Sequence, residues 1–262
     1  MPQLDEILAA ARATLPGLRI RARQLEAAAL DRPAPPDFAG ALRGASLVSV
    51  IAEVKRRSPS GGSINEALDP STLARAYERG GAVAVSVLTE GPHFGGAIGD
   101  LESVVASIAR PVLQKDFILD EIQLLQARAS GASAVLLIVR ALDDRMLRRL
   151  ATCAADLGLA TLVETHNARE LDRALAMETV VIGVNARNLD TFAIDTAAAW
   201  ELLAAVPADR LAVAESGMAT QADVLIAAEA GADAVLVGTA LASASEPAEA
   251  VASLAGVIRV GR

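Results

Sequence analysis

The stretch from Val48 to Lys55 shows the pattern of apolar and polar positions that the rest of the chain repeats. Side chains of a β-strand alternate between two faces. One face is wholly apolar and consists of Val48, Val50, Ala52 and Val54. The other face consists of Ser49, Ile51, Glu53 and Lys55. Charge is confined to the last two positions of this face, which is typical of a barrel strand that helices cover outside and that opens into a site at its C-terminal end.

From Val48 onward, short β-branched runs alternate with longer segments rich in Ala, Leu, Glu and Arg. Strands are predicted near 48–54, 82–88, 111–115, 134–139, 160–164, 180–185, 211–215 and 234–238. Helices are predicted near 70–80, 100–109, 119–130, 143–157, 167–177, 195–204, 219–230 and 247–255. Such alternation predicts an α/β fold with parallel strands and crossover helices. Eight units close naturally into a (β/α)8 TIM barrel. An open doubly wound sheet shares the pattern, but no G-x-G-x-x-G follows the first strand.

Residues 1–46 precede the first strand and have helical periodicity. Two apolar stripes run through them, at Leu4, Ile7 and Leu8 and at Leu25, Ala28 and Ala29. Pro16-Gly17 is predicted to separate two helices, and the run from Arg32 to Pro36 is predicted to end the second. We therefore predict one TIM-barrel domain over 1–262, with an N-terminal helical extension over 1–46 and the barrel over 47–262.

Composition narrows the class of protein. The 262 residues are close to the roughly 250 of a single barrel, and 53% of them are apolar, so a large core is possible. Aromatic residues are only 2%, so the core must be mainly aliphatic. The net charge of −8 argues against nucleic acid as a partner. One cysteine, Cys153, excludes an intrachain disulfide, and the N-terminus MPQLDEIL has no long apolar run. We expect a cytoplasmic monomer without a membrane partner.

Charged and polar side chains gather at the predicted strand ends, and in a barrel these ends meet on one face. They are Glu53, Lys55, Lys115, Glu164, Asn185, Arg187 and Glu215. Strand alternation places Lys115 on the same face as Leu113, and Glu164 on the same face as Leu162, which points both inward. Any one pair could simply form a salt bridge across the barrel mouth. Six charges doing only that is disfavoured, because burying an ion is costly unless it is paired or used.

The last two predicted strands end in small residues, at Ala214-Glu-Ser-Gly217 and Val237-Gly-Thr-Ala240. Either glycine alone could be an ordinary turn. Together they favour a phosphorylated small-molecule ligand, because backbone N–H groups after strands seven and eight are a frequent phosphate site in this fold. His93, His166 and Cys153 have no metal-ligand spacing, so no metal site is expected.

These residues also form a family pattern. The chain resembles indole-3-glycerol-phosphate synthase in every strand from residue 48 to 241. The matching segments are IAEVKRRSPSGG (51–62), SVLTEGPHFGG (86–96), VLQKDFILDEIQ (112–123), AVLLIVR (134–140), LVETHNARELDRAL (162–175), IGVNARNLDTF (182–192), VAESGM (213–218) and AVLVGTAL (234–241). The resemblance implies a carboxy-lyase that closes the ring of 1-(2-carboxyphenylamino)-1-deoxyribulose 5-phosphate, losing CO2 and water. It also implies that no cofactor is needed and that the N-terminal helices lie over the barrel mouth.

The resemblance implies a role for each site residue. Lys115 would be the general acid, Glu164 the base or proton shuttle with Glu53 close by, and Lys55 the partner of the substrate carboxylate, able to exchange acid roles with Lys115. The intermediate would be held by Asn185, Glu215 and Ser216. The anthranilate half would be placed by Ser58, Phe94 and Arg187. The phosphate would be bound by Gly217, Gly238 and Thr239.

Two other functions share parts of the pattern. A sugar-phosphate isomerase, such as phosphoribosylanthranilate isomerase, would need a Cys/Asp pair at strand ends one and six, where this chain has Glu53, Lys55 and Asn185. A non-catalytic barrel that only binds a phosphorylated ligand would leave the charged strand ends replaceable.

The loop from Ser58 to Gly62 is interpreted as a mobile lip that closes over the aromatic ring of the substrate.

Overall fold

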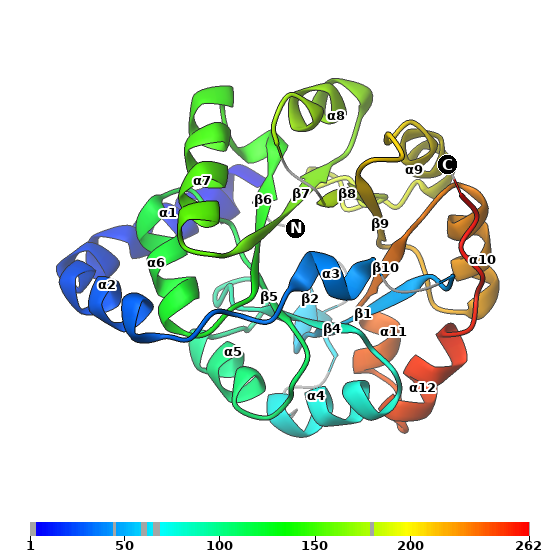
Figure 1. Ribbon diagram of the computed structural model, residues 1–262, viewed down its shortest axis with the longest axis horizontal. Helices are drawn as coiled ribbons and strands as arrows, with labels where there is room; N and C mark the ends of the chain where they lie inside the picture. The colour runs from blue at the N-terminus through cyan, green and yellow to red at the C-terminus, as the bar shows by residue number, and fades with distance from the viewer. Residues whose placement is uncertain (1–3, 44–45, 59–61, 65–68, 179–180, 262) are drawn as a thin grey trace.

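Eight parallel strands close into a barrel in the computed structural model of the protein (Figure 1), which describes residues 4–43, 46–58, 62–64, 69–178 and 181–261. Around the barrel the strands follow the order β1-β10-β9-β8-β7-β6-β5-β4. They are β1 (Ser49–Val54), β4 (Ala84–Leu88), β5 (Val112–Lys115), β6 (Ala134–Ile138), β7 (Ala160–Thr165), β8 (Val181–Asn185), β9 (Leu211–Glu215) and β10 (Ala234–Val237). All eight predicted strands are therefore confirmed, and the closed order excludes the open sheet.

The eight predicted helices also form and surround the barrel (Figure 1). They are α4 (Pro70–Arg79), α5 (Ile98–Val105), α6 (Glu121–Ala129), α7 (Asp144–Asp156), α8 (Ala168–Leu175), α9 (Thr196–Ala204), α10 (Gln221–Glu229) and α12 (Pro247–Leu254). Sequence reasoning missed the short elements η1 (Val139–Ala141) and α11 (Thr239–Ala242). Both are single turns directly after a strand, too short to show a periodicity of their own.

A further small element lies in the predicted lip. β2 (Arg57–Ser58) and β3 (Gly62–Ser63) pair as an antiparallel ladder, with Ser58 opposite Gly62. Residues 59–61, which connect the two strands, lie outside the described residues, so the proposed closure of the lip stays a prediction.

Strand alternation divides the core into two layers, as the first strand predicts. Val48, Val50, Ala52 and Val54 belong to the layer between barrel and helices. Ile51 lies inside the barrel, in one cluster with Leu113, Leu162 and Val213. Aliphatic side chains thus fill the barrel below the level at which its strands end in charged residues.

The N-terminal extension differs from prediction in one respect. Helix α1 (Leu4–Ile20) continues through Pro16 and Gly17, and the break falls at Arg21, before α2 (Ala22–Asp31). The predicted break at Pro16-Gly17 is wrong. Both residues lie on the exposed face of α1, where water can satisfy the carbonyl that a proline leaves unpaired. Leu15 on the buried face packs with Leu25 and Ile122, and this contact stabilises the helix across the proline.

Helices α1 and α3 (Phe38–Leu42) lie at opposite ends of the barrel. The carbonyl oxygen of Leu42 accepts a hydrogen bond from Ser49 Oγ at the first residue of β1 (3.1 Å), so α3 covers the N-terminal ends of the strands. Residues of α1 join the interior cluster from the other end, beside Phe117. The N-terminal helices are expected to lie over the barrel mouth. Helix α1 does so, whereas α3 lies at the opposite end of the barrel. None of the helices in the described ranges combines the length and apolarity needed to cross a membrane.

We predict that Leu42→Ala lowers the free energy of unfolding by about 2–5 kcal/mol, the usual cost of a cavity in a packed core. Leu42 is fully buried and belongs to the apolar cluster inside the barrel, at the N-terminal ends of the strands. Denaturant unfolding followed by circular dichroism measures the change. Leu30→Ala is the matched control, because Leu30 is 79% exposed and should change stability by less than about 0.5 kcal/mol. Equal effects of the two substitutions would contradict a role for Leu42 in the packed core.

Candidate active site

A pocket of about 460 Å³ opens at the C-terminal ends of the strands and holds nearly every predicted site residue. It is lined by Glu53, Lys55, Phe94, Lys115, Glu164, Asn185, Arg187, Glu215, Ser216, Gly217, Gly238 and Thr239, among others. Its volume falls within the range of pockets that enclose small-molecule ligands. The backbone of Ser58 lies in β2, and its side chain is outside the described part of the structure, so its contact with the pocket stays a prediction.

Lys115 is the centre of the charged cluster. It ends β5, and its Nζ lies 3.3 Å from Glu164 Oε2 at the end of β7 and 3.4 Å from Glu215 Oε2 at the end of β9. Both glutamates are about 1% exposed. One ammonium thus lies between two carboxyl groups from two other strands, where little water can screen the charges.

Burial and mutual charge move the pKa values of this trio in different directions. Burial would lower the pKa of Lys115, but the carboxylates of Glu164, Glu215 and Glu53 outweigh it, so the pKa lies above its ordinary value. Burial would raise the pKa of Glu164, but Lys115 and then His166 outweigh it and hold the pKa low. Burial raises the pKa of Glu215 to about 8, with Lys115 opposing and Glu164 adding to the rise. At pH 7 the trio therefore contains an ammonium, a carboxylate and a carboxylic acid, so it can both give and accept protons.

A second charged pair lies beside the first. Lys55 Nζ is 2.8 Å from Glu53 Oε1, and both side chains are largely buried. The neighbouring strand leaves room for them, because a Cβ atom at Gly238 would lie 2.2 Å from Glu53 Oε1 and 2.9 Å from Lys55 Nζ. Gly183 does the same for Glu215, whose Oε1 would lie 2.2 Å from a Cβ there. The missing side chains of two glycines thus provide the space for the carboxyl groups.

Asn185 and Arg187 shape the turn after β8. Asn185 Oδ1 accepts the backbone N–H of Arg187 (2.9 Å), and Arg187 Nη1 donates to the carbonyl oxygen of Phe192 (3.0 Å). Phe192 has a positive φ of 58°, which is rare for a bulky residue. Both side chains thus stabilise a strained loop and line the pocket at the same time.

The ends of β9 and β10 line the part of the pocket where the phosphate of the ligand is predicted to bind. Ser216 has a φ of 67° and Gly217 a φ of 80°. A left-handed serine at a pocket is a conformation that the surroundings must enforce, and such strain gathers at ligand sites. Gly238 and Thr239 face the same pocket from the neighbouring strand end. The geometry therefore brings the two predicted phosphate loops together.

Aromatic side chains form a wall that sequence reasoning found only in part. Phe94 lies 6.2 Å from Phe117 between ring centroids, and Phe117 and Phe192 also line the pocket. Glu90 holds Phe94 in place, because its Oε2 accepts the backbone N–H groups of both His93 (2.8 Å) and Phe94 (2.9 Å). The chain has four phenylalanines, so finding three of them close behind predicted strand ends was a usable signal.

Lysine usage was a second signal. Lys55 and Lys115 are the only lysines in the chain, and every other Lys or Arg position is an arginine. Both lysines lie in the pocket.

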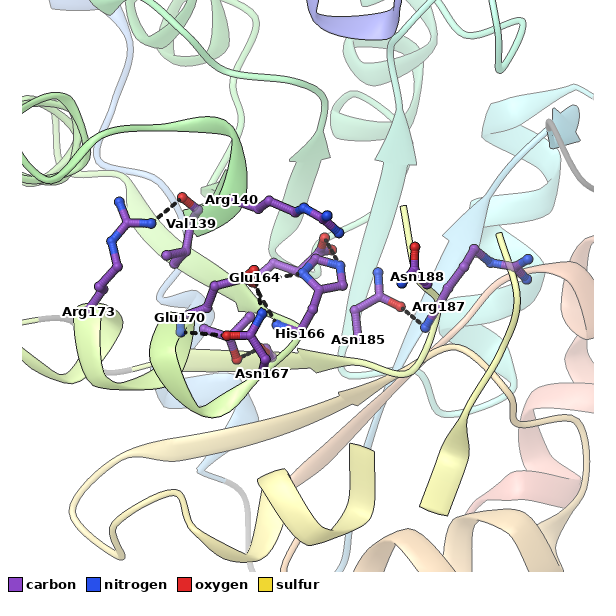
Figure 2. A network of polar contacts seen from close by, with 12 residues as sticks. Val139, Arg140, Glu164, His166, Asn167, Glu170, Arg173, Asn185, Arg187 and Asn188 are labelled. Carbon is purple, nitrogen blue, oxygen red and sulfur yellow. Dashed lines mark hydrogen bonds and ion pairs between the residues drawn. The ribbon is translucent and has the colours of Figure 1, made fainter. Parts of the chain in front are cut away.

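Sequence reasoning also missed a histidine behind the cluster. His166 follows β7 directly, and its ring lies between Glu164 and Glu170, as Figure 2 shows. The available signal was a histidine two residues after the glutamate that ends the predicted strand. The described residues contain no group of three His, Cys, Asp or Glu side chains arranged to bind a metal ion.

Comparison with known proteins shows the family of this chain. The family model for indole-3-glycerol phosphate synthase matches residues 4–254. An indole-3-glycerol phosphate synthase of Nocardioides sp. is 48% identical over 98% of this chain and 99% of its own length. That of Mycobacteroides abscessus is 46% identical over 96% of this chain and 93% of its own. Among solved structures, a 3-hexulose-6-phosphate synthase has a TM-score of 0.63 at 15% identity, covering 79% of this chain and 98% of its own, which supports the fold alone.

We predict that Glu215→Gln gains stability relative to wild type as the pH rises from about 5 to about 8. The pKa of Glu215 is raised from 4.5 to about 8, so between these values the folded protein keeps a proton that the unfolded chain has released. Wild-type stability falls over this window, and a glutamine removes that fall. Urea unfolding of both proteins at several pH values measures the difference. Glu201→Gln, on the exposed face of α9, should show no such trend; a difference between Glu215→Gln and wild type that does not change with pH would contradict the raised pKa.

Proposed function

The chain belongs to the indole-3-glycerol phosphate synthase family, and from that premise we propose how its own residues perform the reaction. The protein is a carboxy-lyase of tryptophan biosynthesis. It closes the ring of 1-(2-carboxyphenylamino)-1-deoxyribulose 5-phosphate and releases CO2 and water to give indole-3-glycerol phosphate. The observation that carries the assignment of roles is the position of Lys115 between Glu164 and Glu215 in the pocket.

Ring closure needs an acid at the substrate ketone. The aryl carbon that bears the carboxylate attacks the ketone carbon, with electrons supplied by the aryl amine. The ketone oxygen takes a proton, which Lys115 supplies as the general acid. The bond to the carboxylate then breaks, CO2 leaves, and its electron pair restores the aromatic ring. No step of this sequence requires a redox change, so we propose that the reaction needs no cofactor.

Dehydration needs a base and a second proton. Glu164 is anionic, because its pKa is held low, and it is the residue that we assign to removing the proton. The hydroxyl group leaves as water when it is protonated. Lys115 or Lys55 can give that proton. Glu53 Oε1 lies 2.8 Å from Lys55 Nζ and can return a proton to Lys55. Asn185, Glu215 and Ser216 line the pocket around this centre and would hold the intermediate.

The two ends of the substrate fit the two ends of the pocket. We assign the anthranilate ring to the wall of Phe94, beside Arg187, with Ser58 as a further contact from β2. Lys55 would pair with the substrate carboxylate. The phosphate would bind the strand ends at Gly217, Gly238 and Thr239. A cleft that gathers two lysines and an arginine concentrates positive potential locally, although the whole chain carries −8.

We further propose that the protein acts as a monomer in the cytoplasm. A phosphorylated substrate does not cross membranes freely, which supports a cytoplasmic location. Size-exclusion chromatography with light scattering tests the oligomeric state.

We predict that Lys115→Met lowers kcat by about 10²-fold or more, the usual effect of losing a general acid. An assay of indole fluorescence with the carboxyphenylamino-deoxyribulose phosphate measures product directly. Circular dichroism must accompany it, because the substitution leaves two buried carboxyl groups facing one another. Near wild-type turnover in folded Lys115→Met would exclude Lys115 as the acid, and absence of product with folded wild type would exclude the reaction itself.

We predict that Thr239→Val raises KM about tenfold and leaves kcat within about twofold of wild type. A hydrogen bond to a charged group contributes about 1.5–3 kcal/mol, and the phosphate is bound equally in ground and transition states. Inhibition by inorganic phosphate should weaken by a similar factor. A fall in kcat at unchanged KM would place the phosphate elsewhere in the pocket.

A further inference from the structure

His166 lies at the rim of the barrel with both ring nitrogens directed at carboxylates (Figure 2). Its Nε2 is 3.4 Å from Glu164 Oε1, and its Nδ1 is 3.1 Å from Glu170 Oε2. The side chain is 7% exposed. Each ring nitrogen therefore faces a carboxylate oxygen, a group that accepts hydrogen bonds.

The contact with Glu164 involves two atoms that otherwise lack partners. Glu164 Oε1 and His166 Nε2 are each buried and make no other hydrogen bond among the described residues. The other oxygen of the carboxylate, Oε2, faces Lys115 Nζ at 3.3 Å. Glu164 therefore has one basic neighbour at each oxygen, Lys115 inside the barrel and His166 behind it, and both lower the pKa of its carboxyl group.

The loop after β7 fixes the far side of the ring. Glu170 Oε2 accepts the backbone N–H of His166 (2.9 Å), and Glu170 Oε1 accepts from Asn167 Nδ2 (2.7 Å). Asn167 in turn caps α8 by accepting the backbone N–H of Glu170 (3.0 Å). The start of α8 thus holds the Glu170 carboxylate in one place, and Glu170 holds the ring.

We propose that His166 is a positioning residue for this reaction: held by Glu170, it fixes Glu164 Oε1 and keeps Glu164 anionic and directed toward Lys115. The inference rests on the proposed role of Glu164 as the base. It gives a function to a buried histidine and a buried glutamate that the chemical steps themselves do not use.

No other charged group contacts the ring among those that the structure describes. Lys115 of β5 and Glu215 of β9 reach it only through Glu164. Arg140 of η1 pairs instead with Asp190, and Arg173 of α8 pairs with Asp144 (2.5 Å). Replacing His166 therefore removes the basic side chain that faces Glu164 Oε1 and leaves Lys115 at Oε2.

The test compares His166→Gln, which keeps a donor without the charge, with His166→Leu, which removes both. We expect kcat to fall about tenfold in His166→Gln and further in His166→Leu, with KM within about twofold of wild type. The acid limb of kcat/KM, taken relative to wild type at each pH so that substrate ionisation cancels, should move up by about one pH unit, because loss of a nearby cation raises the pKa of a carboxylate. A role in stability alone would change neither the limb nor the ratio of kcat to KM.

Glu170→Gln is the second variant, for use if the His166 variants fold poorly. It retains the imidazole ring and changes only the carboxylate that holds the ring. It should move the acid limb in the same direction by a smaller amount. His93→Gln is the matched control, because His93 is the other histidine of the chain and also faces a glutamate, with Nδ1 2.6 Å from Glu90 Oε1, away from Glu164. It should leave the acid limb where it is.

A double-mutant cycle separates the two levels of the proposal. We expect Glu164→Gln to lose about 10²-fold or more in kcat and to show less than a twofold further loss when His166→Gln is added. An active Glu164→Gln would overturn the role of Glu164 as base. An inactive Glu164→Gln with an unaffected His166→Gln, or an effect of His166→Gln that persists in the Glu164→Gln background, would overturn the role of His166 while leaving the base assigned.

Discussion

The buried ammonium of Lys115 between two carboxyl groups is the interaction on which the site depends. Placing ions in a protein interior is costly, and it is tolerated when partners surround each charge. Here the partners come from β7 and β9, strands distant in sequence from β5, so only the closed barrel can supply them. The raised pKa of Glu215 reduces the cost further, because the site then contains one anion and one cation at neutral pH instead of two anions and one cation.

The barrel accommodates these charges by changing side-chain size from layer to layer. Below the site, inward positions are filled by residues such as Leu113 and Leu162. At the level of the carboxyl groups, Gly183 and Gly238 take inward positions on β8 and directly after β10, where any Cβ atom would collide with Glu215 or Glu53. The aliphatic layers fill the barrel below the site, and the two glycines leave space for the carboxyl groups at the top. The charged cluster therefore depends on side-chain size at both levels.

Sequence reasoning located this cluster because a strand has a strict period of two, so a charged residue in phase with inward Leu or Val must point inward. Glu164 and Lys115 follow from that rule alone. The rule gives no information about side chains that leave the strand register, which is why Phe117 and His166 were missed: each lies just beyond its strand, and its direction depends on the loop. The break predicted at Pro16 failed for a related reason, because contacts of Leu15 with α2 and α6 outweighed the local preference.

The choice of cation at the two strand ends follows from the chemistry. Arginine remains protonated under all conditions that proteins meet, so it can bind an anion but cannot give up a proton. A lysine ammonium is a stronger acid than a guanidinium, so it can bind an anion and can also give its proton to an acceptor. In a chain that uses arginine at every other cationic position, the two lysines are the groups able to exchange a proton with a substrate. Arg187, in the same pocket, is fixed to the carbonyl oxygen of Phe192 and suits binding and loop geometry. The division between acid and anchor in this pocket is thus already set by which cation the chain places at each strand end.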